Sequence, residues 1–458
     1  MRFNLPLPVN IKQLSLAAGP LGYLAIQFLD IPLEHRIVLG TAFWMLLWWF
    51  TEVIPLGVSA LLPLILFGGT GVLTNEQLAN AYSNPLIYLF LGGFLLARAI
   101  ERHNLHRRLA LGILRRVGHR SETVLAGVML ATFTLSLWMS NTATAVMMLP
   151  LTLSLLSHIP GSNEKLERSV LLGMAWGANL GGIGTLIGTP PNLVYAAFRQ
   201  QTFHEEVYFM DWTLQVFPIA LLLLIGAFFL LRRGMPNVDL RGMQWPEPEP
   251  WTSGEKRVAS IFALTALAWM TRQWLQPWAG LFQLSDTFIG LTGALALFAF
   301  RDVNRKPLLT WGEAQKIEWG ILLLFGGGMA LASGMQASGW LDALATQGVS
   351  TWHPAYWILG FTILGVWTTE LFSNMALVSG TLPLALAVST AQGIPFEQLA
   401  IPLTVGASCA FMLPMATPPN AIVFASGKIR IPDMARTGFA MNVLATLVLW
   451  LLFAFVFV

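Results

Sequence analysis

Charged residues are scarce in this chain of 458 residues. Asp, Glu, Lys and Arg together make up 11% of it, whereas a soluble protein contains about 25%. Apolar residues make up 55%, and the mean hydropathy is +0.64. So little charge cannot cover the surface of a globule of this size, which excludes an ordinary cytosolic enzyme, a disordered protein and a nucleic-acid binder. The formal net charge of +3 is too small to indicate a polyanionic partner.

Cysteine and clustered histidine are also lacking. Cys409 is the only cysteine, which excludes an intramolecular disulfide and any cysteine-based metal site. The seven histidines show no H-x-x-x-H or H-E-x-x-H pattern, so zinc chemistry is not expected. The N-terminus lacks a signal-peptide core followed by a small-residue cleavage site. We therefore expect the first apolar run, from about Leu14, to remain as a membrane anchor.

What the chain has instead is a series of apolar runs, many of them near the length of about 20 residues that crosses a bilayer. The runs lie near 12–30, 36–50, 53–69, 85–101, 169–187, 212–231, 258–275, 285–300, 317–336, 355–371, 400–413 and 438–458. Two further regions, 122–157 and 372–391, are apolar with a polar centre. The composition and the runs together predict an all-α polytopic membrane protein surrounded by lipid.

Lysine and arginine orient these spans, because cytoplasmic loops carry an excess of both. Of the 26 basic residues, 23 lie before the first span or in the loops 98–120, 158–168, 232–257, 301–316 and 428–436. If all these loops are cytoplasmic, region 122–157 is a hairpin that opens inward, and the two arms at 355–371 and 374–391 form one that opens outward. We therefore expect eleven crossings plus two re-entrant hairpins, with a cytoplasmic N-terminus and an external C-terminus.

The chain also repeats its own motifs at an offset of roughly 230 residues. The repeated motifs are Phe90-x-Gly92-Gly93 with Phe325-x-Gly327-Gly328, Ser140-Asn141 with Ser373-Asn374, and Thr189-Pro190-Pro191-Asn192 with Thr417-Pro418-Pro419-Asn420. Because the two hairpins open to opposite sides, the repeats are expected to be inverted in the membrane. Inverted repeats with broken helices are typical of secondary transporters that bind substrate near the midplane.

These boundaries divide the chain into four parts. We expect an extra N-terminal transmembrane helix at 1–35, a first inverted repeat at 36–232, a cytoplasmic linker at 233–257 and a second inverted repeat at 258–458.

The repeated motifs carry chemistry that suits an anion and a cation together. Ser140-Asn141-Thr142 lies at the centre of the first hairpin, whose arms of about 16 residues reach mid-membrane. Its neutral oxygens suit sodium, and the second arm begins at the tip, so free N–H groups there favour an anion. The paired prolines Pro190 and Pro191 can begin a helix but not continue one, so a half-helix is expected to restart there.

No lysine or arginine lies in these motifs, so bound cations and helix ends must neutralise a dianion. That favours sodium, because a proton-coupled carrier more often places Asp, Glu or His at this depth. The nearest carboxylates are Glu52, which we interpret as structural, and Glu370, a candidate for a direct role beside the second tip. A membrane-embedded enzyme would need clustered Asp, His or Glu at the membrane face, and a channel would not require two hairpins that stop half way. The glycine-rich runs follow no strand, so a nucleotide loop is not expected.

These residues resemble the divalent anion/sodium symporter family, which includes sodium-coupled dicarboxylate, citrate and sulfate carriers. The resemblance covers nearly the whole chain. Its most specific part is Ser408-x-x-Phe411-x-x-Pro414, followed by Ala416-x-x-x-Asn420-x-Ile422-Val423 and Asp433. It implies a non-enzymatic, elevator-type homodimer of the bacterial inner membrane that transports a small dianion together with sodium ions.

The resemblance also implies a site, residue by residue. The first sodium site would be formed by Ser136, Ser140, Asn141 and Gly188. The second would be formed by Thr369, the backbone carbonyl of Phe372, Asn374 and Ala416. The substrate would be bound by Asn141, Thr142, Ser373, Asn374, Thr417 and Pro418.

One position departs from the family pattern. The second tip usually reads Ser-Asn-Thr, and here it reads Ser373-Asn374-Met375. Losing one hydrogen bond to a charged group costs about 1.5–3 kcal/mol. Our first interpretation is a sodium-coupled symporter of C4-dicarboxylates such as succinate, malate or fumarate. The alternatives keep the fold and are a sulfate or citrate carrier, or a sodium-independent anion exchanger.

Overall fold

The computed structural model describes residues 9–116, 120–157, 159, 163–236, 238, 250–280, 283–340 and 352–457. Within these ranges it consists of helices without a β-strand, so the all-α prediction is confirmed. Much of the 233–257 linker, at 237 and 239–249, lies outside the described residues.

The helices run in the following order. In the first half of the chain they are α1 (Val9–Ile26), α2 (Leu33–Thr51), α3 (Leu56–Ser59), α4 (Leu62–Thr70), α5 (Asn75–Tyr82), α6 (Pro85–Arg102), α7 (Leu105–Leu114), α8 (Ser121–Ser136), α9 (Asn141–Ser157), α10 (Glu164–Ile183), α11 (Pro190–Phe203) and α12 (Phe209–Arg232). In the second half they are α13 (Ser253–Leu275), α14 (Asp286–Ala299), α15 (Trp311–Ala314), α16 (Trp319–Ala337), α18 (Pro354–Thr368), α19 (Asn374–Gln392), α20 (Phe396–Ala407), α21 (Pro418–Phe424) and α22 (Ile431–Phe455).

Four interruptions of the helices fall where the motifs predict them. In the first hairpin α8 ends at Ser136 and α9 begins at Asn141. In the second hairpin α18 ends at Thr368 and α19 begins at Asn374. At the paired prolines, α11 begins at Pro190 and α21 begins at Pro418. Proline is tolerated in the first turn of a helix because an N–H group at that position would have no intrahelical partner.

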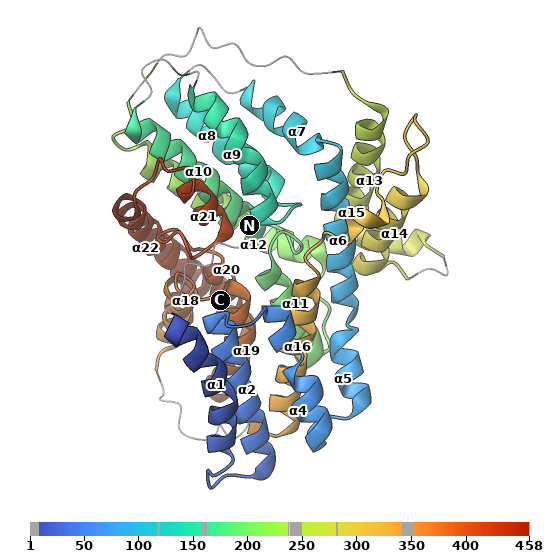
Figure 1. The fold of residues 1–458 in the computed structure, drawn as a ribbon, viewed down its shortest axis with the longest axis vertical. Coiled ribbons are helices and arrows are strands. Elements are labelled where there is room, and N and C mark those ends of the chain that lie inside the picture. Colours follow the sequence, from blue (N-terminus) through green and yellow to red (C-terminus); the bar gives the residue numbers. More distant parts are fainter. Residues whose placement is uncertain are drawn as a thin grey trace.

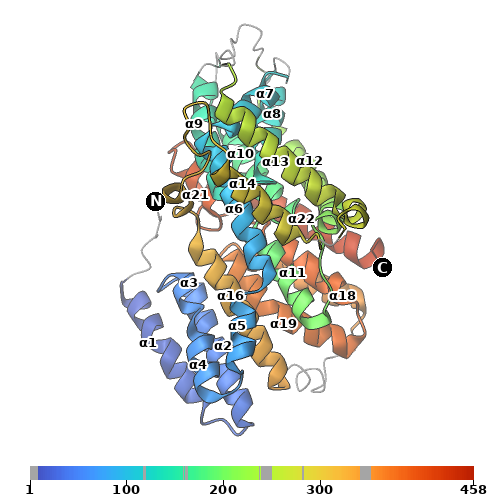
Figure 2. The ribbon, with the colours of Figure 1, turned by 90° about the vertical axis from the view of Figure 1, so that its right-hand side faces the viewer.

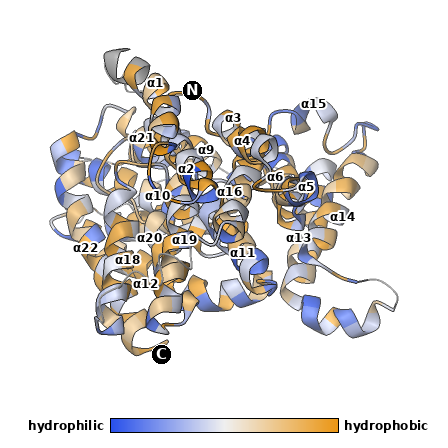
Figure 3. Ribbon diagram, turned by 90° about the horizontal axis from the view of Figure 1, so that it is seen from below, coloured by the Kyte–Doolittle hydropathy of each residue, from blue (hydrophilic) through white to orange (hydrophobic). Residues whose placement is uncertain are grey.

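Among the described residues, five segments are long and apolar enough to cross a membrane by length and composition: Asn75–Arg102, Phe209–Arg232, Trp319–Ala337, Asn374–Gln392 and Ile431–Phe455. Other apolar helices, among them α8, α9, α14 and α18, are shorter. Exposed apolar side chains line α12 and α22, for example Leu214 at 62% and Phe439 at 51%, and apolar residues run along several outer helices in Figure 3. Such faces suit lipid better than water, as expected of an integral membrane protein.

Four short helices lie where the sequence was interpreted differently. The run 53–69, expected as one span, is divided into α3 and α4, because Pro63 is tolerated only in the first turn of a helix. The segment 70–84, expected as a loop, contains α5, whose start is stabilised by reciprocal hydrogen bonds between Thr74 and Gln77. The basic loop 98–120 contains α7.

Side-chain contacts join the loops that are rich in lysine and arginine. Arg98 pairs with Glu313, and His103 Nε2 lies 2.9 Å from the carbonyl oxygen of Leu308, so loops 98–120 and 301–316 adjoin. Lys428 Nζ lies 2.8 Å from Glu167 Oε2, which joins the loops at 158–168 and 428–436. Figure 1 shows α7, α8 and α9 toward the end of the molecule opposite to α1, α2 and α4, and Figure 2 shows the same separation from the side. The contacts agree with placing these loops on one side of the membrane.

The three arginines outside the basic loops are all bound. Arg272 lies 2.9 Å from Glu206 and 3.4 Å from Asp286. Arg199 lies 2.7 Å from Glu205 and 3.2 Å from Glu397. The Arg36 guanidinium donates to two backbone carbonyls, those of residues 27 and 31. Each of these arginines is therefore held by groups of the protein itself, two of them by carboxylates and one by backbone carbonyls.

A buried ion pair between α7 and α13 gives a prediction for the pH dependence of stability. Arg108 Nη2 lies 3.1 Å from Glu255 Oε2, and Thr252 N donates to the same oxygen at 2.8 Å. Burial alone raises the pKa of Glu255, but the hydrogen bonds from Thr252 and Arg108 outweigh it, so the pKa is lowered. A lowered pKa stabilises the fold above the ordinary value of 4.5, and this contribution is lost as the pH falls below it.

We therefore expect Glu255→Gln to lower the melting temperature in detergent at neutral pH. The difference from the wild type should shrink as the pH falls below 4.5. The exposed Glu76 provides a control, since Glu76→Gln removes a carboxylate that has no ion pair in the described part of the chain. A constant difference at every pH would show that the carboxylate charge contributes nothing.

Candidate functional site

The first hairpin tip holds the amide of Asn141 in a fixed position. Asn141 begins α9, and its Oδ1 accepts a hydrogen bond of 2.8 Å from Ser136 Oγ at the end of α8. Ser140 Oγ accepts a hydrogen bond from the backbone N–H of Ala143 at 3.3 Å. Three of the four residues predicted for the first sodium site are thus arranged around one tip, with side-chain oxygens rather than charged groups.

The second tip has the same arrangement. Asn374 begins α19, and its Oδ1 lies 2.7 Å from Thr369 Oγ1. The same hydroxyl lies 2.6 Å from the carbonyl oxygen of Ala407 at the end of α20. A hydroxyl has a single hydrogen, so the group of three oxygens holds one more acceptor than its hydrogen can serve. An oxygen-rich cluster of this kind is suited to a cation.

Two glycines let backbone oxygens approach the first tip. A methyl group at Gly182 would lie 2.2 Å from Asn141 Oδ1. A methyl group at Gly188 would lie 2.5 Å from the carbonyl oxygen of Gly182 and 3.0 Å from that of Ser136. Real side chains essentially never come within 3.0 Å of such atoms, so only glycine permits this packing. Gly188 therefore lies next to the Ser136–Asn141 pair.

Replacing Gly188 with alanine tests this cluster. We expect the added methyl group to displace the carbonyls of Gly182 and Ser136, raising the half-saturating sodium concentration by about tenfold, because overpacking costs about 1–3 kcal/mol. The measurement is the sodium dependence of uptake into proteoliposomes.

Gly360→Ala is the matched control, since nothing lies within 4 Å of a methyl group at that position. It should leave sodium dependence unchanged. Normal sodium dependence in Gly188→Ala would argue against a cation at this cluster.

The two broken helices are stabilised by equivalent asparagines. Asn192 Nδ2 donates to the carbonyl oxygens of Gly182 at 3.1 Å and Thr185 at 2.8 Å, ten and seven residues earlier. Asn420 Nδ2 donates to the oxygens of Ala410 and Leu413 at 3.1 Å each, again ten and seven residues earlier. The amides thereby satisfy carbonyls that leave the helix inside the protein. The sequence motif contained both asparagines, but their role became visible only in the structure.

Glu370 anchors the unwound segment between α20 and α21. Its carboxylate is 4% exposed and accepts hydrogen bonds from the backbone N–H groups of Phe411 at 2.8 Å, Met412 at 3.0 Å and Leu413 at 3.1 Å. Asn442 Nδ2 on α22 donates a fourth at 2.9 Å. These four bonds give the carboxylate a role in holding the broken helix beside the second tip.

The remaining predicted residues are distributed over the two tips and the second break. Thr142 is half-buried on α9, Ser373 precedes the first residue of α19 without a side-chain capping bond, and Pro418 begins α21 one residue after Thr417. The backbone N–H of Ala416 donates to the carbonyl of residue 413. The Phe372 ring packs against Phe50 of α2, with centroids 4.5 Å apart. Met375, the departure from the family pattern, is 6% exposed.

Helix packing brings the motifs of the two halves together. The second arm of the first hairpin, α9, packs against α21, and the second arm of the second hairpin, α19, packs against α11. Asn179 of α10 donates to Thr417 Oγ1 at 3.1 Å, a contact that the sequence interpretation missed. Within the described ranges no hydrogen bond joins Asn141 directly to Asn374.

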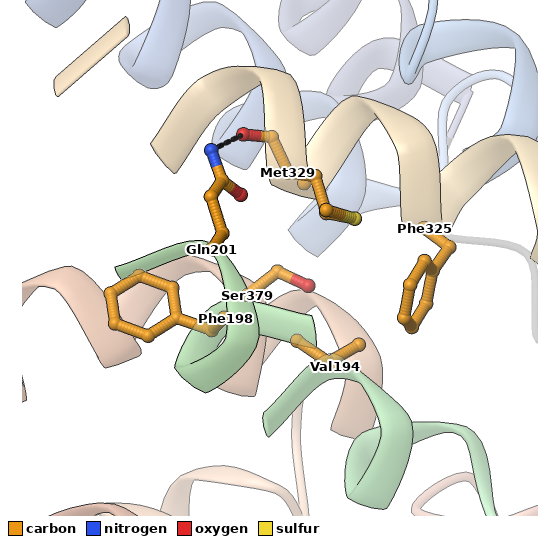
Figure 4. Close-up of a pocket in the computed structure, with 7 residues that line it drawn as sticks. Val194, Phe198, Gln201, Phe325, Met329 and Ser379 are labelled. Carbon is orange, nitrogen blue, oxygen red and sulfur yellow. Dashed lines mark hydrogen bonds between the residues drawn. The ribbon is translucent and has the colours of Figure 1, made fainter. Parts of the chain in front are cut away.

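A small cavity lies farther along the same helices. It is lined by Val194 and Phe198 of α11, Phe325 and Met329 of α16, and Ser379 of α19, with Gln201 at its edge (Figure 4). Gln201 Nε2 lies 3.4 Å from the carbonyl oxygen of Met329. The lining is largely apolar and contains none of the predicted ligands, so the candidate site is defined by the tips and not by this cavity.

Broken helices, oxygen-rich tips and lipid-facing helices define a membrane transporter rather than an enzyme. A family model described as "Citrate transporter" matches residues 46–406. The sodium-dependent dicarboxylate transporter SdcS of Staphylococcus aureus (strain bovine RF122 / ET3-1) is 35% identical over 481 residues, covering 98% of this chain and 92% of the relative. SdcS of Staphylococcus saprophyticus is 36% identical over 478 residues, with 97% and 92% covered.

Two solved structures share the fold. The YdaH transporter of Alcanivorax borkumensis has a TM-score of 0.58 at 14% identity, covering 82% of this chain and 86% of its own. MtrF of Neisseria gonorrhoeae, described in a study of antimetabolite efflux pumps, has a TM-score of 0.57 at 13% identity, covering 100% and 96%. The sequence matches are far stronger, and the chain belongs to the citrate transporter family that the model describes and to the divalent anion/sodium symporters that its motifs resemble.

Proposed function

We propose that the protein is a secondary active transporter that carries small divalent anions, C4-dicarboxylates such as succinate, malate and fumarate, together with sodium. The observation that carries this proposal is the pair of matched tips, where Ser136 with Asn141 and Thr369 with Asn374 form neutral oxygen clusters. No lysine or arginine lies in either motif, so the charge of a dianion is balanced by co-bound cations and helix N-termini. The relatives named as sodium-dependent dicarboxylate transporters support both the ion and the substrate.

In this proposal the hairpin tips and the broken helices bind two sodium ions and one dianion. The first sodium ion is bound by Ser136, Ser140, Asn141 and Gly188, and the second by Thr369, the carbonyl of Phe372, Asn374 and Ala416. The dianion is bound by Asn141, Thr142, Ser373, Asn374, Thr417 and Pro418. Each asparagine serves both ligands, because an amide offers an oxygen to the cation and N–H groups to a carboxylate.

The architecture we propose consists of two inverted repeats, 36–232 and 258–458, after an extra helix at 1–35, with the linker 233–257 between the repeats. The equal hydrogen-bond spacings at Asn192 and Asn420 support it. So does the reciprocal packing of α9 on α21 and of α19 on α11. Eleven crossings, two re-entrant hairpins and an elevator movement of the hairpin-bearing part complete this proposal.

The same proposal places the protein as a homodimer in the bacterial inner membrane, with the N-terminus cytoplasmic and the C-terminus external. Gln398 Nε2 donates to the carbonyl oxygen of Phe457 at 3.0 Å. The segment 391–400, which contains no basic residue, therefore lies next to the C-terminus, and this supports an external position for both.

The alternatives of the same fold are transport of citrate or sulfate and sodium-independent exchange. The matching family model is described as a citrate transporter, which supports citrate as an alternative substrate. The buried Met375 supports a substrate that does not need a hydrogen bond from a threonine hydroxyl at the second tip.

Uptake of radiolabelled succinate into proteoliposomes, with and without an inward sodium gradient, tests the proposal. Saturable uptake that requires sodium is the expected result, with citrate and sulfate as competitors. Succinate uptake that is independent of sodium would indicate exchange. Sodium-dependent uptake of citrate or sulfate without succinate would replace the substrate and leave the coupling.

A further inference from the structure

One buried amide of the first half of the chain reaches into the second half. Asn179 lies on α10 and is fully buried, with 0% exposure. Its Nδ2 donates to the carbonyl oxygen of Ala410 at 3.1 Å and to Thr417 Oγ1 at 3.1 Å. Both acceptors belong to the unwound segment that precedes α21. We propose that Asn179 is a positioning residue that turns the Thr417 hydroxyl toward the bound dianion, an inference that rests on the proposed function.

The orientation of the Asn179 amide follows from its partners. A backbone carbonyl only accepts hydrogen bonds, so the amide must present its nitrogen to Ala410. The second N–H of the same nitrogen then points to Thr417 Oγ1, which accepts it. The Thr417 hydroxyl hydrogen is left without an acceptor among the described residues, so it is available to donate to a carboxylate.

The paired prolines free this hydroxyl from the task that a threonine usually has at this position. Thr417 precedes the first residue of α21, where a threonine normally accepts hydrogen bonds from the N–H groups of the first helical turn. Pro418 and Pro419 have no N–H, and the Thr417 side chain makes no capping bond to the remaining donor of this turn, the N–H of Asn420. The amide of Asn179 therefore replaces the helix as the donor, and it sets the direction of the hydroxyl.

The first repeat has no such arrangement. Thr189 also precedes two prolines and makes no capping bond. At the offset between the two Thr-Pro-Pro-Asn motifs, the counterpart of Asn179 is Ala407, which has no side-chain donor. The oriented hydroxyl thus belongs to the half of the chain in which Met375 replaces a threonine, so Asn179 and Thr417 together supply a donor where the second tip has lost one.

A double-mutant cycle of Asn179→Asp and Thr417→Val tests the proposal through succinate uptake by proteoliposomes. Asn179→Asp keeps the size of the side chain but removes its N–H groups, so the Thr417 hydroxyl would donate to the new carboxylate. We expect each single variant to raise KM for succinate by about 10- to 100-fold, with a smaller change in the sodium requirement. The effect of the double variant should be well below the product of the two single effects, because both changes remove the same donor.

Asn192→Asp is the matched control, since Asn192 donates only to backbone carbonyls. Its effect should multiply with that of Thr417→Val. If the increases in KM caused by Asn179→Asp and by Thr417→Val multiplied in the double variant, the positioning role of Asn179 would be overturned. So would an unchanged KM in Thr417→Val or Asn179→Asp.

Folding of each variant is checked by its melting temperature in detergent. If Asn179→Asp does not fold, Asn179→Ser replaces it in the cycle, and the coupling of Asn179→Ser with Thr417→Val decides the role of Asn179. A wild type that shows no sodium-dependent succinate uptake would contradict the proposed function itself. A wild type that transports succinate while the cycle shows no coupling would contradict only the role of Asn179.

Discussion

Replacing Asn374 with alanine is expected to abolish sodium-driven succinate uptake. Asn374 Oδ1 lies beside Thr369 Oγ1, and its Nδ2 has no hydrogen-bond partner in the described part of the protein. The amide is thus free to contact a cation with its oxygen and a carboxylate with its nitrogen. Removing two bonds to charged groups, at about 1.5–3 kcal/mol each, predicts a loss of transport efficiency of at least about 100-fold.

The measurement is the initial rate of uptake as succinate and sodium are varied separately. Both half-saturating concentrations should rise in Asn374→Ala, because one side chain contacts both ligands. Asn163→Ala is the control: its side chain caps α10 through the N–H of Leu166 at the surface, so the same amide is lost with only about 1 kcal/mol of stability. A rise in the succinate value alone would remove Asn374 from the sodium site.

Replacing Glu370 with glutamine is expected to reduce both stability and transport strongly. The carboxylate accepts three backbone N–H groups and one side-chain amide, and an amide in its place would direct its own N–H groups toward some of these donors. Each buried N–H without an acceptor costs about 1–3 kcal/mol. We expect a lower melting temperature in detergent and a sodium requirement raised by about tenfold or more, since the 411–413 segment leads into Ala416.

Glu397→Gln serves as the comparison, because Glu397 pairs with Arg199 on a half-exposed surface and such pairs contribute about 0–1 kcal/mol. Glu370→Asp adds a second test, since it keeps the charge but is too short to reach all four donors. If Glu370→Gln were as stable and as active as Glu397→Gln, the anchoring role of the carboxylate would be excluded.

The interruptions of the helices were predictable because their causes are local. A pair of prolines indicates where a helix begins, and a polar segment between two apolar arms indicates where a hairpin turns. The family resemblance, and not this local reasoning, grouped Ser136 with Asn141 and Thr369 with Asn374, and both pairs form hydrogen bonds. The short amphipathic helices α5 and α7 were not predicted, since neither is apolar or long enough to resemble a membrane span.

Contacts between distant parts of the chain were not predictable. Asn179 stands in an apolar run and meets Thr417 only after the two halves have packed together. The partners of Glu370 are mainly backbone N–H groups, which every residue except proline carries, so no pattern of side chains marks them. The sequence therefore identified Glu370 as unusual for its depth but left open what it holds.

The two halves match in their asparagines and differ at Thr142 against Met375 and at Asn179 against Ala407. A site with an imperfect two-fold axis presents different donors to the two ends of a bound molecule. Succinate has identical ends and fits equally well after being turned around, but the two ends of malate differ, because only one of them carries the hydroxyl group beside its carboxylate. In the proposed site malate should therefore bind in one preferred orientation, whereas succinate should have no such preference.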